Sequence, residues 1–191
     1  MSDRHLLETS RLRLDPFRHE DVESLHALWC DPFVRKFLWD DIIIPMEAAR
    51  EVVAASVASF EQHSFGFWNV ALKKTDQALG FCGLRFIEKT PEIEILYGLW
   101  PKFWGKGFAT EASLAVLRFG FETCKLERIL AGAGPPNAAS IRVIERLGMK
   151  FDRQTRRNNL DIFYCALTHA EWQQAGQQKK LGSAEKLNVL E

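Results

Sequence analysis

Apolar and polar positions along the chain follow two periods, which predicts a mixture of helices and strands. Residues 11–14 alternate between polar and apolar, which indicates a strand with one solvent-facing side, and Pro16 ends it. Apolar residues then recur at helical spacing over 19–29 and from Pro45 to about residue 62, so we expect two amphipathic helices. Asp31-Pro32 interrupts this pattern, and the aromatic stretch from there to residue 41 is expected to be irregular.

Three strand-like runs follow, over 65–72, 78–87 and 92–100, and only short polar or Gly/Pro breaks separate them. Consecutive strands with short links predict an antiparallel meander. A helical pattern over 108–124 and a strand pattern over 126–133 come next. Because a strand, a crossover helix and a second strand usually form a parallel pair, we expect one such pair within an otherwise mostly antiparallel sheet.

The last third of the chain carries helix signals that agree with one another. Asn137 is a good N-cap, apolar residues at 141, 144 and 147 form one stripe, and Gly148 suits the left-handed residue after the last turn. Two strands, 149–155 and 160–167, are expected to join at Asn158-Asn159. Residues beyond 172 are polar and are expected to fray. The sequence therefore predicts one domain over 1–172 and a flexible tail over 173–191.

Composition limits the partners to be expected. The chain has 191 residues, 47% of them apolar, and its 25 Lys+Arg residues balance 25 Asp+Glu residues. A net charge of zero gives no global attraction to nucleic acid or to an anionic membrane, so we expect neither partner. No segment reaches the roughly 18 uncharged apolar residues of a membrane span, and the first residues lack a signal-peptide layout, which favours a cytoplasmic location.

The four cysteines are far apart in the sequence and lie in apolar runs, which indicates reduced thiols. We expect neither a disulfide framework nor a metal site from Cys30, Cys82, Cys124 and Cys165. None of them has a His beside it in the sequence, so an acyl-cysteine intermediate is not expected either.

The strongest chemical signal is a glycine-containing turn between a strand and a helix, Trp104-Gly105-Lys106-Gly107-Phe108-Ala109-Thr110. Glycines let the backbone approach a ligand closely, and the free N–H groups at the start of a helix suit a diphosphate. Lys106 can add positive charge. The patterns of a P-loop and of a dinucleotide-binding fingerprint are both missing. On the glycines alone, a purely structural tight turn is an equal alternative.

This segment resembles the acetyl-CoA signature of the GNAT N-acetyltransferase superfamily, and the resemblance runs from Leu7 to Trp172, closest to the branch of ribosomal-protein N-terminal acetyltransferases. Gly107 and Ala109 match the signature, whereas Trp104 stands where Gln or Arg is usual. The resemblance implies an α+β layered fold whose mixed, mostly antiparallel sheet has about seven strands, a splayed parallel pair and about four flanking helices. It also implies that the pyrophosphate of acetyl-CoA binds the amides of 105–110, with Leu99 and Trp100 in the same cofactor-binding set.

A second block of the resemblance is 137–149. In the family the Asn, here Asn137, contacts the pantetheine arm, although a plain helix cap is the alternative for this residue. Many relatives carry a thiol-protonating Tyr at the position of Ile144. The resemblance therefore leaves Ser140, which lies one turn from the cap, as the expected substitute. Arg142 is expected near the 3′-phosphate, and an ordinary solvated Arg is its alternative.

Acyl transfer from a thioester to an amine requires a neutral amine, a polarised carbonyl and a proton for the departing thiolate. By the resemblance, a β-bulge at Tyr97-Gly98-Leu99 would offer a backbone N–H to the carbonyl, and Gly98 makes a bulge physically reasonable. The strand that carries the catalytic Glu in some relatives matches Glu94. Glu92 shares its strand face, and a water chain or a merely solvated pair of carboxylates are the alternatives.

The acceptor class follows only weakly from the sequence. At pH 7, deprotonation costs a lysine-like amine with a pKa near 10.4 about 4–5 kcal/mol and an α-amine with a pKa near 8 about 1 kcal/mol, which favours a protein N-terminus or an amino acid as acceptor. A small amine is the further acceptor that we expect. Segments 29–41 and 156–160 are expected to recognise it. We expect direct transfer in a ternary complex, by a monomer or a homodimer. The alternatives are an inactive CoA-binding sensor or assembly module and a fold in which the turn binds nothing.

Overall fold

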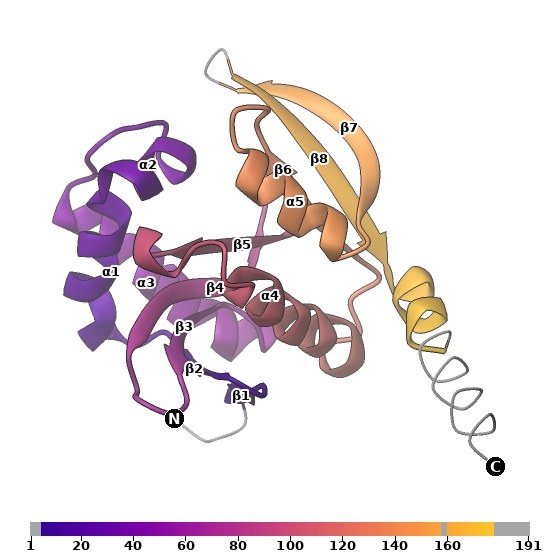
Figure 1. Cartoon of the computed structure of the whole chain (residues 1–191), viewed down its shortest axis with the longest axis horizontal. Coiled ribbons are helices and arrows are strands. Elements are labelled where there is room, and N and C mark those ends of the chain that lie inside the picture. The colour runs from indigo at the N-terminus through magenta and orange to yellow at the C-terminus, as the bar shows by residue number, and fades with distance from the viewer. Residues whose placement is uncertain (1–4, 158–159, 178–191) are drawn as a thin grey trace.

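The computed structural model describes residues 5–157 and 160–177, and a single mixed sheet of eight strands runs through it (Figure 1). The strand order is β1-β2-β3-β4-β5-β6-β8-β7, and every neighbouring pair is antiparallel except β5 and β6. The strands are β1 (Leu7–Glu8), β2 (Leu12–Pro16), β3 (Phe67–Leu72), β4 (Ala78–Phe86), β5 (Ile93–Leu99), β6 (Arg128–Ala133), β7 (Lys150–Arg157) and β8 (Leu160–Thr168).

Helices cover both faces of the sheet. They are α1 (Val22–Cys30), α2 (Pro32–Leu38), α3 (Met46–His63), α4 (Phe108–Arg118) and α5 (Ala138–Arg146), with short 3-10 turns at His19–Asp21 and Pro101–Phe103. A π-helical turn at Phe119–Thr123 continues α4, and residues 169–177 are helical. None of the helices described is long and apolar enough to cross a membrane.

Two hydrophobic clusters fill the space between these layers. One packs α4 and α5 against one face of the sheet, with Trp68, Leu84 and Ile95 among its buried members. The other joins α1, α2 and much of α3 to Phe67 and Phe81 on the opposite face. Side chains alternate between the two faces along each strand, so neighbouring residues such as Phe67 and Trp68 belong to different clusters.

The architecture implied by the sequence is confirmed: a mostly antiparallel sheet with one parallel pair, flanked by helices. The meander of β3, β4 and β5 is present, and α3 begins at Met46, directly after Pro45. Asn137 caps α5 and Gly148 adopts φ 76°, as the helix signals predicted. The two-residue strand β1, which no periodicity announces, raises the strand count from about seven to eight.

Three local expectations differ from the structure. Asp31-Pro32 begins helix α2 instead of breaking the order, because the Asp31 carboxylate accepts hydrogen bonds from the N–H groups of Phe33 and Val34 at 2.9 and 3.3 Å. The predicted helix 108–124 changes to π-helical geometry at Phe119. Helical structure also continues past Trp172 to residue 177, where a polar tail was expected. The predicted turn at Asn158-Asn159 and residues 178–191 lie outside the described residues.

Strands β5 and β6 separate almost as soon as they meet. Their parallel pairing consists of one Cα partnership, Glu94 with Leu130, whereas β5 pairs with β4 at seven consecutive positions. Beyond Glu94 the two strands diverge and leave a fork in the sheet, with the start of α4 beside it (Figure 1). The fork is where the sheet can admit a ligand.

Candidate active site

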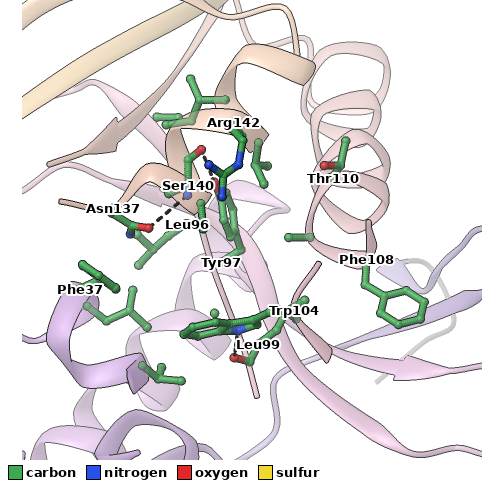
Figure 2. A pocket seen from close by; sticks show the side chains of 18 of the residues that line it. Phe37, Leu96, Tyr97, Leu99, Trp104, Phe108, Thr110, Asn137, Ser140 and Arg142 are labelled. Atoms are coloured by element: carbon green, nitrogen blue, oxygen red, sulfur yellow. Dashed lines mark hydrogen bonds between the residues drawn. The ribbon is translucent and has the colours of Figure 1, made fainter. Parts of the chain in front are cut away.

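A groove of about 280 Å³ runs from the start of α4 along β5 to the start of α5 (Figure 2). Its walls combine backbone of the glycine turn with side chains from β5, β6, α2 and α5. Of the cofactor-binding residues expected from the sequence, the following line it: Leu99, Trp104, Gly105, Gly107, Phe108, Ala109, Thr110, Asn137, Ser140 and Arg142. The segments that the resemblance singled out therefore meet in one place.

The glycine turn opens its backbone toward this groove. Gly105 and Gly107 have φ values of 73° and 79°, a left-handed conformation that favours glycine at both positions. Gly107 caps α4 without a side chain, so the N–H groups of the first helical turn have no side-chain cap. Among the described residues, the buried Thr110 hydroxyl also lacks a hydrogen-bond partner. These donors, with the positive end of the helix dipole, fit a diphosphate.

Arg11 holds the glycine turn from outside. Its guanidinium donates to the Lys106 carbonyl at 3.2 Å and to the Glu111 carboxylate at 2.6 Å, and it lies 4.5 Å from the centroid of the Phe108 ring. Burial alone would raise the pKa of Glu111, but hydrogen bonds from Thr9 and Arg11 lower it below its ordinary value. Arg11 was missed as a site residue because about 95 residues separate it from the turn it positions.

Several expected cofactor residues contribute differently from what the motif suggests. Trp104 donates its indole N–H to the Leu99 carbonyl at 2.7 Å, which ties the turn to the end of β5. The Phe108 side chain points away from the groove, so its backbone is the part available there (Figure 2). Trp100 packs against both hydrophobic clusters and Lys106 points toward the Phe103 ring, and neither residue lines the groove.

Two hydroxyl groups meet on the other side of the groove. The Asn137 side chain accepts the Ser140 N–H at 3.1 Å, and the hydroxyl oxygens of Ser140 and Tyr97 lie 2.7 Å apart (Figure 2). Burial raises the pKa of Tyr97 to about 12, against the opposing effect of its hydrogen bond to Ser140. Ile144, where the resemblance led us to expect the counterpart of a thiol-protonating Tyr, is buried. From the sequence Tyr97 was expected only as part of a bulge; its hydroxyl reaches α5 across 43 residues of chain, a contact that sequence spacing does not indicate.

The expected β-bulge at 97–99 is not present, because β5 pairs with β4 in unbroken register from Ile93 to Leu99. The opening comes instead from the departure of β6. Trp100 donates its N–H to the Leu79 carbonyl, so in this antiparallel ladder the even-numbered residues bond β4. The N–H groups of Tyr97 and Leu99 consequently face the fork, where β6 has no pairing partner for them.

A second cavity of about 650 Å³ lies across the fork and shares five lining residues with the groove, Phe37, Leu38, Leu96, Gly132 and Asn137. Glu94 lines it, is only 5% exposed, and accepts two hydrogen-bonding contacts of 2.8 Å from Arg85 on one carboxylate oxygen.

Glu92 is differently placed. It is bound to Arg153 and Arg128 and lines neither the groove nor the second cavity. Of the two carboxylates left open by the sequence, the structure therefore brings Glu94, and not Glu92, to the wall of the second cavity.

Two cavities meet at the fork in the sheet, and the free N–H groups at the start of α4, which we call the amide cradle, line one of them. This arrangement is that of an acyltransferase-like site, and comparison with known proteins identifies its family. A family model described as an acetyltransferase (GNAT) domain matches residues 11–150. The uncharacterised N-acetyltransferase p20 of Bacillus licheniformis is 31% identical over 174 residues, which cover 87% of this chain and 97% of that protein. The chain belongs to the GNAT acetyltransferase family.

Solved structures agree with this assignment. A GNAT-family acetyltransferase from Bacillus anthracis superposes with a TM-score of 0.73 at 27% identity and covers 87% of this chain and 99% of that one. The RimL ribosomal L7/L12 α-N-protein acetyltransferase, solved in complex with coenzyme A, has a TM-score of 0.71 at 17% identity, over 85% and 97% of the two chains. At that identity the second likeness concerns the fold alone.

Proposed function

We propose that the protein is an acetyl-CoA-dependent N-acetyltransferase that transfers the acetyl group directly to a primary amine in a ternary complex. The observation that supports this most strongly is the meeting of an amide cradle and a carboxylate-lined cavity at one fork. Each feature alone has a structural explanation, but together they supply one binding place for each of two substrates. Acetyl-CoA, when bound, supplies the activated thioester.

Different residues of the groove would bind different parts of the cofactor. The N–H groups and the Thr110 hydroxyl at the start of α4 would bind the pyrophosphate, and the exposed Arg142 would approach a further phosphate. The N–H groups of Tyr97 and Leu99 face the fork, as a strand would present them to an extended pantetheine arm or to a thioester carbonyl. Asn137 positions Ser140 by capping α5.

Glu94 is the proposed general base, acting directly or through a water. It is the one buried carboxylate among the described residues, and it lies at the end of the second cavity where the fork begins. An α-amine needs only about 1 kcal/mol to become neutral at pH 7, and a lysine-like amine about 4–5 kcal/mol. An N-terminal or similarly weak amine therefore makes the smaller demand on this base.

Ser140 and Tyr97 are the proposed partners of the departing thiolate. The two hydroxyl oxygens lie 2.7 Å apart, and the phenol also contacts the Ser140 carbonyl at 3.3 Å. When the phenol donates to Ser140, the serine O–H can be offered to a group in the groove. Burial raises the pKa of Tyr97 to about 12, above the ordinary thiol value of about 8.5. The phenol therefore keeps its own proton and stabilises the developing negative charge on sulfur by donating a hydrogen bond, directly or through Ser140.

The acceptor is proposed to be the N-terminal α-amine of a protein or peptide or a small amine. RimL is described as an α-N-protein acetyltransferase, and the likeness of fold supports the N-terminal option here. The second candidate, a CoA-binding module without turnover, is favoured by the buried Ile144 in place of the family Tyr. Turnover decides between the two.

Thermal unfolding with and without CoA tests the cradle. CoA at 100 times its Kd should add about 2.7 kcal/mol of stability, which corresponds to a rise of several degrees. Gly107→Val should weaken CoA binding, because a β-branched side chain strains a φ of 79° and crowds the amides. A folded protein that shows no shift at millimolar CoA would rule out both candidates.

Thiol release with an amine panel then tests turnover. Glu94→Gln should lower kcat at least 100-fold while the CoA-dependent shift is retained, because the carboxylate lies outside the cofactor groove. Glu92→Gln, on the same strand face, is the matched control and should keep most of its activity. Full activity of Glu94→Gln would assign the base elsewhere.

A further inference from the structure

The volume and the lining of the second cavity indicate which chemical group the acceptor carries besides its amine. At about 650 Å³ it lies in the range of pockets for drug-sized ligands, and a methylamine or a glycine residue would leave most of it to water. One wall comes from α1, α2, α3 and the loop that joins α2 to α3, and another comes from β8 and the loop after β6. The apolar side chains on them include Trp29, Phe37, Trp39, Ile44, Leu160 and Ile162.

The charges in this cavity have one predominant sign. Four carboxylates line it, those of Asp40, Glu88, Glu94 and Asp161, against the two cations Lys36 and Arg85. Arg85 is engaged by Glu94. Apart from this pair, three carboxylates and one lysine line the cavity, so its net charge is negative. A negative cavity favours a ligand with a single cationic head and disfavours a ligand whose amine has a carboxylate next to it.

Apolar side chains predominate on the two walls, with Lys36, Asp40 and Asp161 among them. Glu94 and its partner Arg85 lie on neighbouring strands at the start of the fork, whereas α2 and the β8 side supply apolar surface farther along the walls. Ile42, in the loop after α2, is 62% exposed, so the apolar surface of this cavity continues to its rim. An amine at Glu94 would thus have its substituent between aromatic and branched aliphatic side chains.

From this juxtaposition we propose that the acceptor is a primary amine carried on a bulky apolar body, aromatic or branched aliphatic, without a neighbouring carboxylate. The inference rests on the proposed function and narrows it. Two sources present this chemistry, an arylalkylamine and a peptide whose first residue is large and apolar. Polyamines and aminoglycosides carry several separated charges, and burying those against aromatic walls costs their hydration.

Steady-state thiol release at saturating acetyl-CoA tests the proposal with the full chain. We expect kcat/KM for 2-phenylethylamine, or for a Phe-initiated tripeptide amide, to exceed that for methylamine, a Gly-initiated tripeptide amide, spermidine and kanamycin at least 10-fold. Free phenylalanine, which adds only a carboxylate to the same ring and amine, should be at least 10-fold poorer than 2-phenylethylamine. Preference between the first two substrates distinguishes the small-molecule source from the peptide source.

Cavity-filling variants connect the preference to this cavity. Ile162→Trp on β8 should lower kcat/KM for the bulky acceptor at least 10-fold and that for methylamine less than 3-fold. Phe151→Trp on the paired strand β7, which is 67% exposed and lines neither cavity, is the matched control. If Ile162→Trp loses the CoA-dependent thermal shift, Val52→Phe on the α3 side of the same cavity takes its place.

The outcomes separate the two proposals. A higher kcat/KM for spermidine, kanamycin or free phenylalanine, with CoA still binding, would overturn the acceptor class and leave the acetyltransferase intact. An Ile162→Trp or Val52→Phe protein that binds CoA and keeps its bulky-amine activity would do the same. No turnover with any amine, by a protein that binds CoA, would overturn the proposed function and this inference together.

Discussion

Tyr97 and Ser140 come from different elements, a strand and a helix, and their hydroxyl groups meet at the groove. Adjacent residues on β5 point to opposite faces of the sheet, so Tyr97 faces α5, whereas Leu96 packs on the α2 side and borders both cavities. The strand thereby presents one chemistry on each face. We propose that the Tyr97 hydroxyl acts on the thiol, because Ile144 on α5 has no hydroxyl group for that role.

Tyr97→Phe should lower kcat about 10–100-fold and change the Kd for CoA less than 3-fold, because a hydrogen bond to a developing thiolate is made only as the thiolate forms. Ser140→Ala should have a similar effect, and the double variant should be little worse than either single one, since both removals break the same pair. Initial rates and CoA titration measure these effects. Ser24→Ala, which removes a distant hydroxyl on α1, is the control.

The pKa of Tyr97 sets the pH dependence of this contribution. Because burial raises it to about 12, the phenol stays protonated throughout the range in which the enzyme can be assayed. The wild-type rate should therefore rise with amine deprotonation and then level off, with no decline from Tyr97 below about pH 11. Fully additive losses in the double variant, or a Tyr97→Phe variant with wild-type kcat, would contradict the proposed pair.

Helix α2 is a short element that both cavities depend on. Its first turn is held by the Asp31 carboxylate and Pro32, and its side chains Phe37 and Leu38 line the groove and the second cavity alike. A seven-residue helix has little stability of its own, so the cap and its packing on α1 decide whether it forms.

Asp31→Ala should cost about 1 kcal/mol of stability, the usual value of such a cap. It should also raise KM for the acceptor while the Kd for CoA changes little, since most of the cofactor groove lies on other elements. Urea unfolding and initial rates measure the two effects. Asp31→Asn, which can still accept the capping hydrogen bonds, should restore both; a raised KM in Asp31→Asn would contradict the explanation by capping.

The helix over 169–177 begins with a capping box. Thr168 accepts the Glu171 N–H at 3.3 Å, and the Glu171 carboxylate accepts the Thr168 N–H at 3.0 Å and pairs with Lys150 at 2.8 Å. These contacts, led by the Lys150 hydrogen bond, lower the pKa of Glu171 to about 2. A pKa below the unfolded value means that the ionised carboxylate stabilises the fold at neutral pH, and that this stability disappears as pH falls from about 5 toward 2.

Glu171→Ala should therefore lower stability at pH 7 by about 1 kcal/mol, a modest figure because water still reaches and screens this partly exposed carboxylate. Glu171→Gln should lose less, since an amide can still complete the capping box. Thermal unfolding of the three proteins at pH 7 and at about pH 3 measures both differences. A gap between wild type and Glu171→Gln that widens as the pH falls would contradict the assigned direction of the pKa shift.

How far the sequence predicts each feature depends on the distance over which its cause acts. The glycine turn and the Asn137 cap are local, because backbone conformation and capping are decided within a few residues. Arg11 with Glu111 and Tyr97 with Ser140 depend on which strands and helices become neighbours, and periodicity does not contain that information. Asp31-Pro32 is a different case: the same two residues are typical of a break and of a helix start, and packing on α1 decides between them.

At the scale of the whole molecule, the sheet separates the two cavities except at the fork between β5 and β6, which is the gap that connects them. Groove and second cavity lie mainly on opposite faces, and β5 supplies side chains to both. Two substrates that approach from opposite faces can be bound together, and their reacting groups can meet only at the gap. This geometry requires no intermediate carried by the protein.

The cysteines lead to the same conclusion. Burial raises the pKa of Cys82 to about 12 and that of Cys124 to about 11, and the pKa of Cys165 is also raised, so these thiols are protonated and weakly nucleophilic. Neither these three nor Cys30 lines the groove or the second cavity. No cysteine is thus among the residues that line the groove or the second cavity, where it could accept an acetyl group from the cofactor.

Initial rates measured over both substrate concentrations should accordingly give intersecting lines in double-reciprocal plots, as a sequential mechanism requires. The intact mass of the protein after incubation with acetyl-CoA alone should show no added acetyl group, and alanine at each of the four cysteines should preserve turnover in every variant that folds. Parallel lines, together with a stable acetyl adduct that one Cys→Ala variant abolishes, would replace direct transfer by a covalent route. Because the fork brings both substrates to one gap and the cysteines lie away from it, we expect the intersecting pattern.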